Sequence, residues 1–134
     1  MIQEENARTI PRCPLLVKIA PELDDEDLEE VVHVCEAHDI AGLIATNTTV
    51  DHSAIPNARN QTGGLSGAPL LRRSTEVLQF VCKNTRLPVV ASGGIFDAQT
   101  ARKKLAAGAA LIQVYTGYVY RGPGLLQELM PAFE

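Results

Sequence analysis

One stretch, residues 88–116, constrains the fold of this chain more than any other. The apolar run Pro88-Val89-Val90-Ala91 breaks at Gly93-Gly94, an amphipathic segment follows, and a second apolar run from Ala109 ends in Tyr115-Thr116. This order predicts strand, loop, helix and strand, with both strands ending on the same side of a parallel sheet. Glycines at the end of a buried strand let backbone N–H groups approach an anion. We therefore expect a phosphate-bearing ligand between Gly93-Gly94 and Tyr115-Thr116.

The same order of elements occurs earlier in the chain. Residues 15–20 form a short apolar run closed by Pro21, which is typical of a buried parallel strand and has Lys18 as its only charge. Acidic residues at 24–27 begin an amphipathic helix that ends near His38, because negative charge is favoured at helix N-termini. The run Leu43-Ile44-Ala45 predicts the next strand.

Two caps and one long loop complete the pattern. We expect Ser74 to cap a third helix and Asp97 to cap the amphipathic helix that lies within residues 88–116. A last helix should follow Gly122-Pro123. Residues 50–69 contain only turn residues and glycine clusters, and a loop of that length inside a compact domain is usually functional. We interpret it as an active-site loop.

These elements predict an α/β fold with four β/α units. A TIM (β/α)8 barrel has eight such units in about 250 residues, so we expect the C-terminal half of a TIM barrel over residues 15–134. Residues 1–14 show no period and are expected to be a boundary loop. A half-barrel would leave both edge strands unpaired and one face of its sheet uncovered.

The composition of the chain limits the kinds of partner and compartment that we expect for it. The net charge is −4 and no basic stripe occurs, so nucleic acid is not an expected partner. No secretory signal and no apolar run of about 20 residues is present, which predicts a cytoplasmic chain. Cys13, Cys35 and Cys82 lack Cys-x-x-Cys spacing, and we expect buried free thiols rather than a disulfide or a zinc site.

Two further features suggest chemistry at the strand ends. Lys18 near the end of a buried strand would be costly unless its charge met a partner, and a carboxylate at the barrel rim is one alternative. Thr46-Asn47-Thr48-Thr49 follows the second strand directly and could hydrogen-bond a flat polar ring. The alternative for these four residues is a turn or helix cap.

Five motifs, in order, resemble the quinone-dependent (class 2) dihydroorotate dehydrogenases. The likeness extends from about Leu15 to the C-terminus and corresponds to the C-terminal half of that family. The motifs are Val17-Lys18-Ile19-Ala20-Pro21, Ala45-Thr46-Asn47-Thr48-Thr49, Gln61-Thr62-Gly63-Gly64-Leu65-Ser66-Gly67, Ser92-Gly93-Gly94-Ile95 and Gln113-Val114-Tyr115-Thr116-Gly117.

The resemblance implies a role for each motif. Lys18 would lie against the ring of FMN, where a cation stabilises the anionic reduced flavin, and Thr46 would also contact the flavin. Asn47 and Thr48 would bind the substrate, dihydroorotate or its product orotate. The remaining positions would hold FMN, largely around its phosphate: Gly67, Gly94, Tyr115 and Thr116. A purely structural use of the glycines, in turns and C-caps, is the alternative.

The resemblance further implies an FMN-dependent oxidoreductase of pyrimidine biosynthesis that oxidises dihydroorotate to orotate with quinone as acceptor. In that family the catalytic base is a Ser of the first half-barrel, and N-terminal segments meet quinone and membrane. Neither Ser66 nor Ser92 matches that base, so we name no catalytic residue and expect this chain alone to be inactive. Full-length members are peripheral to the inner membrane, on its cytoplasmic face in bacteria and in mitochondria in eukaryotes.

Two other functions stay open. The chain could be a non-catalytic half-barrel that binds a phosphate ligand and pairs with a second copy of itself, or with a separately encoded first half as a split enzyme. It could also belong to another phosphate-binding barrel, such as a sugar-phosphate isomerase or a synthase. Such a barrel has no reason to combine Lys18 with Thr46-Asn47-Thr48, so Lys18→Ala would leave its ligand affinity unchanged.

Overall fold

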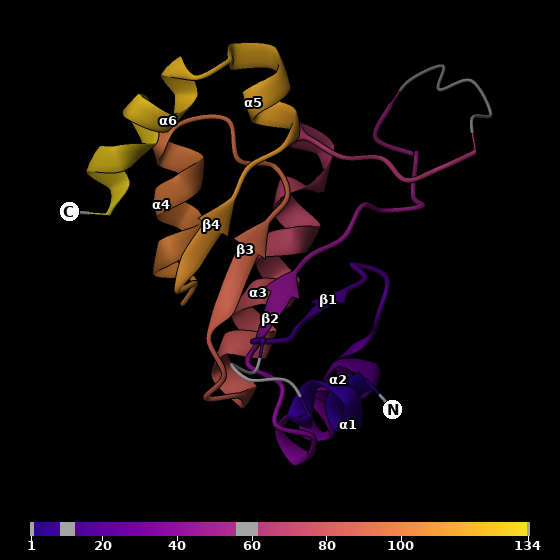
Figure 1. Ribbon diagram of the computed structural model, residues 1–134. Coiled ribbons are helices and arrows are strands. Elements are labelled where there is room, and N and C mark those ends of the chain that lie inside the picture. The colour runs from indigo at the N-terminus through magenta and orange to yellow at the C-terminus, as the bar shows by residue number, and fades with distance from the viewer. Residues whose placement is uncertain (1, 9–12, 56–61, 134) are drawn as a thin grey trace.

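The computed structural model describes residues 2–8, 13–55 and 62–133 (Figure 1). Two predicted segments lie partly outside the described residues: the boundary loop, and the long loop at residues 56–61. Gln61 of the glycine-rich motif is among the residues not described.

The centre of the fold is a parallel sheet of four strands in the order β1-β2-β3-β4. The strands are β1 (Leu16–Ile19), β2 (Gly42–Ala45), β3 (Val89–Ser92) and β4 (Leu111–Gln113). Ile19 pairs with Ala45, Ala45 with Ala91, and Ala91 with Ile112. Helices connect successive strands, so the prediction of four β/α units forming part of a TIM barrel is confirmed.

Helices cover one face of this sheet, with α3 and α4 directly behind the strands and α5 and α6 beyond their carboxyl ends (Figure 1). The helices are α1 (Ile2–Ala7), α2 (Asp25–Ala37), α3 (Leu71–Asn84), α4 (Ala98–Ala106), α5 (Thr116–Arg121) and α6 (Gly124–Leu129), with short 3-10 turns η1 (Ala68–Leu70) and η2 (Met130–Ala132). Among the described residues, none of the helices has the length and apolar character needed to span a bilayer.

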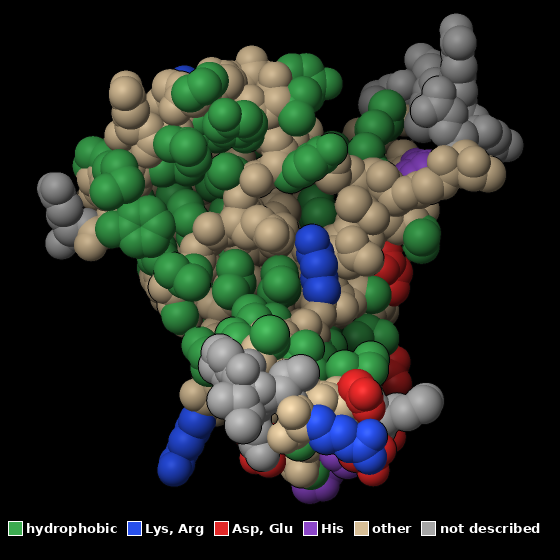
Figure 2. Space-filling model, viewed as in Figure 1, with side chains coloured by type: hydrophobic (Ala, Val, Ile, Leu, Met, Phe, Trp, Pro, Cys, Tyr) green, Lys and Arg blue, Asp and Glu red, His purple; other side chains and the backbone are tan. Residues whose placement is uncertain are grey.

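The core lies between the sheet and its helices. Ile19, Ala45 and Ala91 point to this face and are buried against Leu28 of α2 and Leu78 of α3. Alternate strand residues point the other way. On that open face Leu16 and Leu111 are 44% and 59% exposed, and hydrophobic side chains gather over the sheet in Figure 2. One face of the sheet is therefore left uncovered, as expected for a half-barrel.

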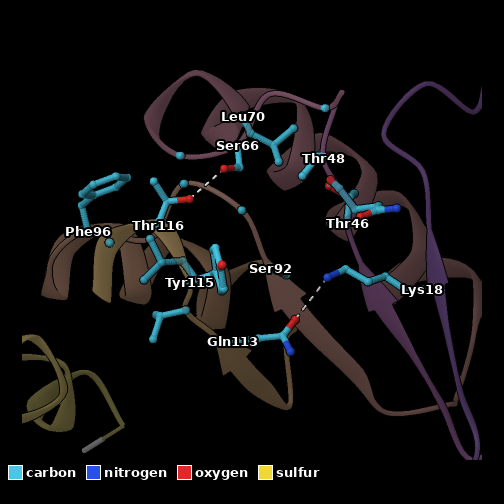
Figure 3. Close-up of a pocket in the computed structure, with 18 residues that line it drawn as sticks. Lys18, Thr46, Thr48, Ser66, Leu70, Ser92, Phe96, Gln113, Tyr115 and Thr116 are labelled. Carbon is cyan, nitrogen blue, oxygen red and sulfur yellow. Dashed lines mark hydrogen bonds between the residues drawn. The ribbon is translucent and has the colours of Figure 1, made fainter. Parts of the chain in front are cut away.

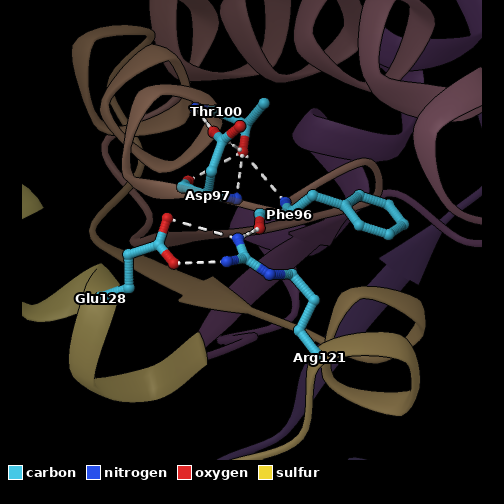
Figure 4. Close-up of polar contacts among 5 residues, drawn as sticks. All are labelled: Phe96, Asp97, Thr100, Arg121 and Glu128. Carbon is cyan, nitrogen blue, oxygen red and sulfur yellow. Dashed lines mark hydrogen bonds and ion pairs between the residues drawn. The ribbon is translucent and has the colours of Figure 1, made fainter. Parts of the chain in front are cut away.

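Acidic side chains cap helices α2 and α4 at their N-termini. The Asp24 side chain accepts a hydrogen bond from the Asp27 N–H at 2.9 Å, and the Asp97 side chain accepts one from the Thr100 N–H at 2.7 Å. The Thr100 hydroxyl in turn accepts from the Asp97 N–H, which completes a capping box (Figure 4). The predicted cap at Asp97 and the predicted acidic start of α2 are confirmed.

Arg121 of α5 contacts the loop after β3 and also helix α6. Its guanidinium donates to the Phe96 carbonyl at 2.6 Å and pairs with Glu128 at 2.7 Å (Figure 4). The loop after β3 is therefore held from α4 on one side and from α5 and α6 on the other.

Two expectations about local structure were wrong, and one helix was not predicted. Residues 2–7 form helix α1 rather than a loop, because Gln, Glu and Ala favour helix without any hydrophobic period, and the Asn6 side chain bonds the backbone of Cys13. Ser74 lies inside α3 and is buried, so it does not cap that helix. Helix α5 was not predicted from the sequence.

The cysteines differ in their burial. All three are free, with Cys35 buried, Cys82 partly buried and Cys13 exposed. Burial raises the pKa of the Cys35 thiol, so this group stays protonated and inert. The expectation of buried thiols was wrong for Cys13, which follows the short helix α1 at the surface.

Candidate functional site at the carboxyl ends of the strands

A cavity of about 370 Å³ lies across the carboxyl ends of the four strands (Figure 3). Ligand cavities in parallel α/β proteins lie at this edge because loops from every strand meet there. All eight residues predicted to bind cofactor or substrate line it: Lys18, Thr46, Asn47, Thr48, Gly67, Gly94, Tyr115 and Thr116. Their assigned contacts with FMN or substrate remain predictions.

Lys18 is exposed on the open face of the sheet, not buried as expected. Its ammonium nitrogen lies 3.4 Å from the Gln113 side-chain oxygen of β4, on the far edge of the sheet (Figure 3). Among the ion pairs of the described residues none involves Lys18, so the alternative of a carboxylate partner at the rim is not supported. A cation in this position is available to a ligand.

The segment after β2 continues the sheet instead of capping a helix. The Thr46 N–H donates to the Ser92 carbonyl at 3.0 Å, and the Asn47 N–H donates to the Ile19 carbonyl at 2.8 Å. Thr46 is buried and its hydroxyl donates to the Asn47 carbonyl, whereas the Asn47 and Thr48 side chains are exposed at the cavity. No helix begins here in the described chain, so the helix-cap alternative is wrong.

The long loop folds back onto this segment. Thr49 and Leu65 exchange two backbone hydrogen bonds, of 3.0 and 2.7 Å, and a Cβ on Gly64 would overlap the Thr48 hydroxyl. Glu22 accepts from the Thr49 hydroxyl and the Val50 N–H; although burial raises its pKa, these hydrogen bonds hold that pKa below its ordinary value. The described ends of the loop are thereby fixed at the cavity, and sequence reasoning missed Glu22.

Glycines form the end of the cavity near β3. Gly93 and Gly94 have φ of +103° and +76°, where only glycine is unstrained. A Cβ on Gly94 would lie 2.5 Å from the Leu71 Cα, and one on Gly67 would lie 3.0 Å from the Thr116 side chain. Both sites therefore require a residue without a side chain.

Residues with hydroxyl groups line the same end of the cavity, together with Gly94. The Ser66 and Thr116 hydroxyls lie 2.8 Å apart, and Tyr115 is 79% exposed (Figure 3). In the described residues the Gly94 N–H has no hydrogen-bond partner. Ser66 and Gln113 were not predicted as site residues; Gln113 could have been found from its place at the end of β4, where the register sets it beside Ser92.

Comparison with known proteins gives consistent results. The family profile described as "Dihydroorotate dehydrogenase" matches residues 2–133. "Dihydroorotate dehydrogenase (quinone)" of Gloeobacter violaceus is 50% identical over 119 residues, covering 87% of this chain and 34% of that protein. The protein of the same name from Escherichia coli O1:K1 / APEC is 46% identical over 121 residues, covering 87% of this chain and 36% of that protein.

Solved structures agree. The crystal structure of DHODH from Eimeria tenella in complex with ferulenol superposes with a TM-score of 0.83 at 38% identity, covering 91% of this chain and 34% of that one. The chain thus spans about a third of the length of the relatives that it matches.

Proposed function

This chain belongs to the dihydroorotate dehydrogenase family, and we propose that its cavity binds FMN and dihydroorotate as part of an enzyme that oxidises dihydroorotate to orotate and reduces quinone. The observation that carries the proposal is the convergence of eight predicted residues, from five separate segments of the chain, on one cavity. FMN would supply the two-electron acceptor for the hydride of dihydroorotate.

The residues present fit FMN. The end of the cavity near β3 and β4 offers the free Gly94 N–H and the Thr116 and Ser66 hydroxyls, which are donors suited to a phosphate. Because Gly67 and Gly94 have no Cβ, their backbone packs closely against Thr116 and against Leu71 at the start of α3. The volume of about 370 Å³ falls within the range of ligand sites.

We assign the opposite end to the flavin ring and the substrate. Lys18 would stabilise negative charge on the ring, and its contact with the neutral Gln113 amide leaves the charge uncompensated. Thr46 would contact the ring, while the exposed Asn47 and Thr48 side chains would donate and accept hydrogen bonds to dihydroorotate.

No catalytic base is assigned to the described residues. The Ser66 hydroxyl is engaged by Thr116 rather than by a group that could activate it. We expect the 134-residue chain by itself to bind FMN weakly and to leave dihydroorotate unchanged.

The test is a visible spectrum of the purified chain titrated with FMN, followed by dihydroorotate under anaerobic conditions. We expect bound flavin that does not bleach, and Lys18→Ala should weaken FMN binding and shift its reduction potential. Lys83→Ala, an exposed lysine of α3 that does not line the cavity, is the matched control and should change neither. Failure of the wild type to bind FMN would refute the proposed cofactor, and bleaching would refute the inactivity of the chain.

One observation favours a second candidate, association with another half-barrel. Strands β1 and β4 lie at the two edges of the sheet, and each has an exposed leucine, Leu16 and Leu111. Unpaired edges of this kind are sites of strand pairing. Sedimentation of the chain at several concentrations tests this candidate, and a monomer at every concentration would exclude self-association.

A further inference from the structure

We propose that Lys104 is a positioning residue of the phosphate site. Its side chain places a buried positive charge behind the Gly93-Gly94 turn. Through Ser74, it also orients this turn so that the Gly94 N–H points into the cavity. The inference rests on the proposed function, since it concerns how the same cavity recognises the phosphate of FMN.

The first observation is a continuous buried hydrogen-bond path from α4 to the turn. Lys104 has no exposed surface, and its ammonium donates to the Ser74 hydroxyl at 2.6 Å. Ser74 is likewise fully buried, and its hydroxyl faces the Gly93 carbonyl at 3.2 Å and the Leu71 carbonyl at 3.3 Å. The ammonium is therefore two hydrogen bonds from the peptide that joins Gly93 to Gly94.

The geometry of that peptide links the path to the cavity. Among the described residues the only cis peptide is Ala45–Thr46, so the Gly93–Gly94 peptide is trans. In a trans peptide the carbonyl and the following N–H point in opposite directions. Because the Gly93 carbonyl is directed at Ser74, the Gly94 N–H is directed away from it, and this N–H has no partner in the described chain.

The second observation is a charge without a counter-ion. None of the ion pairs in the described residues includes Lys104. On the elements packed against α4, Arg72 and Arg73 pair with Glu76 on α3, and Glu128 on α6 pairs with Arg121, so both carboxylates are already engaged. The other charged groups on these elements are cations: Lys83 on α3, and Arg102 and Lys103 on α4 itself.

Burial lowers the pKa of Lys104 to about 8, from an ordinary value of 10.5. A buried ammonium without a carboxylate partner is unfavourable for folding. If Lys104 only filled space in the core, an uncharged side chain of the same shape would serve as well. A phosphate dianion at the Gly94 N–H would supply the missing negative charge, and would favour the protonated form of Lys104.

The experiment compares FMN with riboflavin, which lacks the phosphate, on the wild type, Lys104→Met and Lys104→Arg. We expect Lys104→Met to bind FMN about 10- to 100-fold more weakly and riboflavin within about threefold of the wild type. Lys104→Arg should restore the preference for FMN. Lys103→Met is the matched control, because it removes the same charge from an exposed neighbour and should retain that preference.

A second readout needs no variant. Calorimetric titration at pH 8.5 in two buffers of different ionisation enthalpy should show the wild type taking up about half a proton when FMN binds, and none when riboflavin binds. If FMN binds without proton uptake, or if Lys104→Met keeps the wild-type ratio of FMN to riboflavin affinity, the inference is overturned while the proposed function stands. If the wild type binds no FMN, the proposed function fails and the inference fails with it.

Discussion

The stability of the protein should depend on pH through Lys104, and Lys104→Met should remove that dependence. In the folded chain this ammonium is fully buried, and its pKa is lowered from 10.5 to about 8 by burial. The unfolded chain holds the same proton to higher pH. Between the two values the unfolded state therefore binds more protons, so the free energy of unfolding rises with pH in this window.

The magnitude follows from the two pKa values. A difference of two and a half units corresponds to a cost of about 3 kcal/mol at pH 7, when Lys104 is charged in both states. Raising the pH from 7 to 9 removes about 1.4 kcal/mol of that cost. Lys104→Met has no proton to lose, so its advantage in unfolding free energy over the wild type should shrink by this amount.

The assay is urea unfolding at pH 7 and pH 9, followed by far-UV circular dichroism because the chain contains no Trp. Other groups titrate equally in both proteins and cancel in the difference. If the gap between wild type and Lys104→Met is the same at both pH values, Lys104 does not carry the buried charge that we infer.

Two further predictions concern the turn after β3. Gly94→Ala should lower the free energy of unfolding by more than about 3 kcal/mol and abolish FMN binding, since the new Cβ would collide with the backbone of α3. The control is Gly122→Ala, which has a similar φ of +65° but lies in open space, and it should lower the free energy of unfolding by about 1 kcal/mol. Equal losses for the two variants in thermal denaturation would contradict this reasoning. Asp97→Ala should cost about 1 kcal/mol at pH 7. The Thr100 N–H holds the pKa of Asp97 below its ordinary value, so this stabilisation is present above pH 4 and should disappear as the pH falls through the folded pKa; a loss that persists in acid would show that the cap acts without its charge.

Much of the site could be predicted before the fold was known, for a simple topological reason. In a parallel sheet every strand delivers its following residues to the same edge. Residues that directly follow β2, β3 and β4, such as Thr46, Gly94 and Thr116, must therefore meet, and the structure places them around one cavity. The cap at Asp97 was predictable because it depends on local sequence: its side chain accepts a hydrogen bond from an N–H group three residues along the chain.

What the sequence could not decide depends on contacts between distant segments. Lys103 and Lys104 are adjacent and chemically identical, yet one is exposed and the other is fully buried, since α4 turns only one of them toward α3. Ser74 has the local pattern of a cap, but Lys104, thirty residues later, and Gly93 give its hydroxyl another use. Lys18 was expected to be buried, and it is exposed because helices cover only one face of the sheet.

The sequence by itself thus determined the four strands and the helices that connect them, the family, and the edge of the sheet where the chemistry lies, because these depend on local pattern and on chain direction. Only the tertiary structure decided which side chains lose their water. Burial is set by packing between elements far apart in the chain, and it is burial that makes Lys104, rather than its neighbour, a candidate for the charge behind the phosphate site.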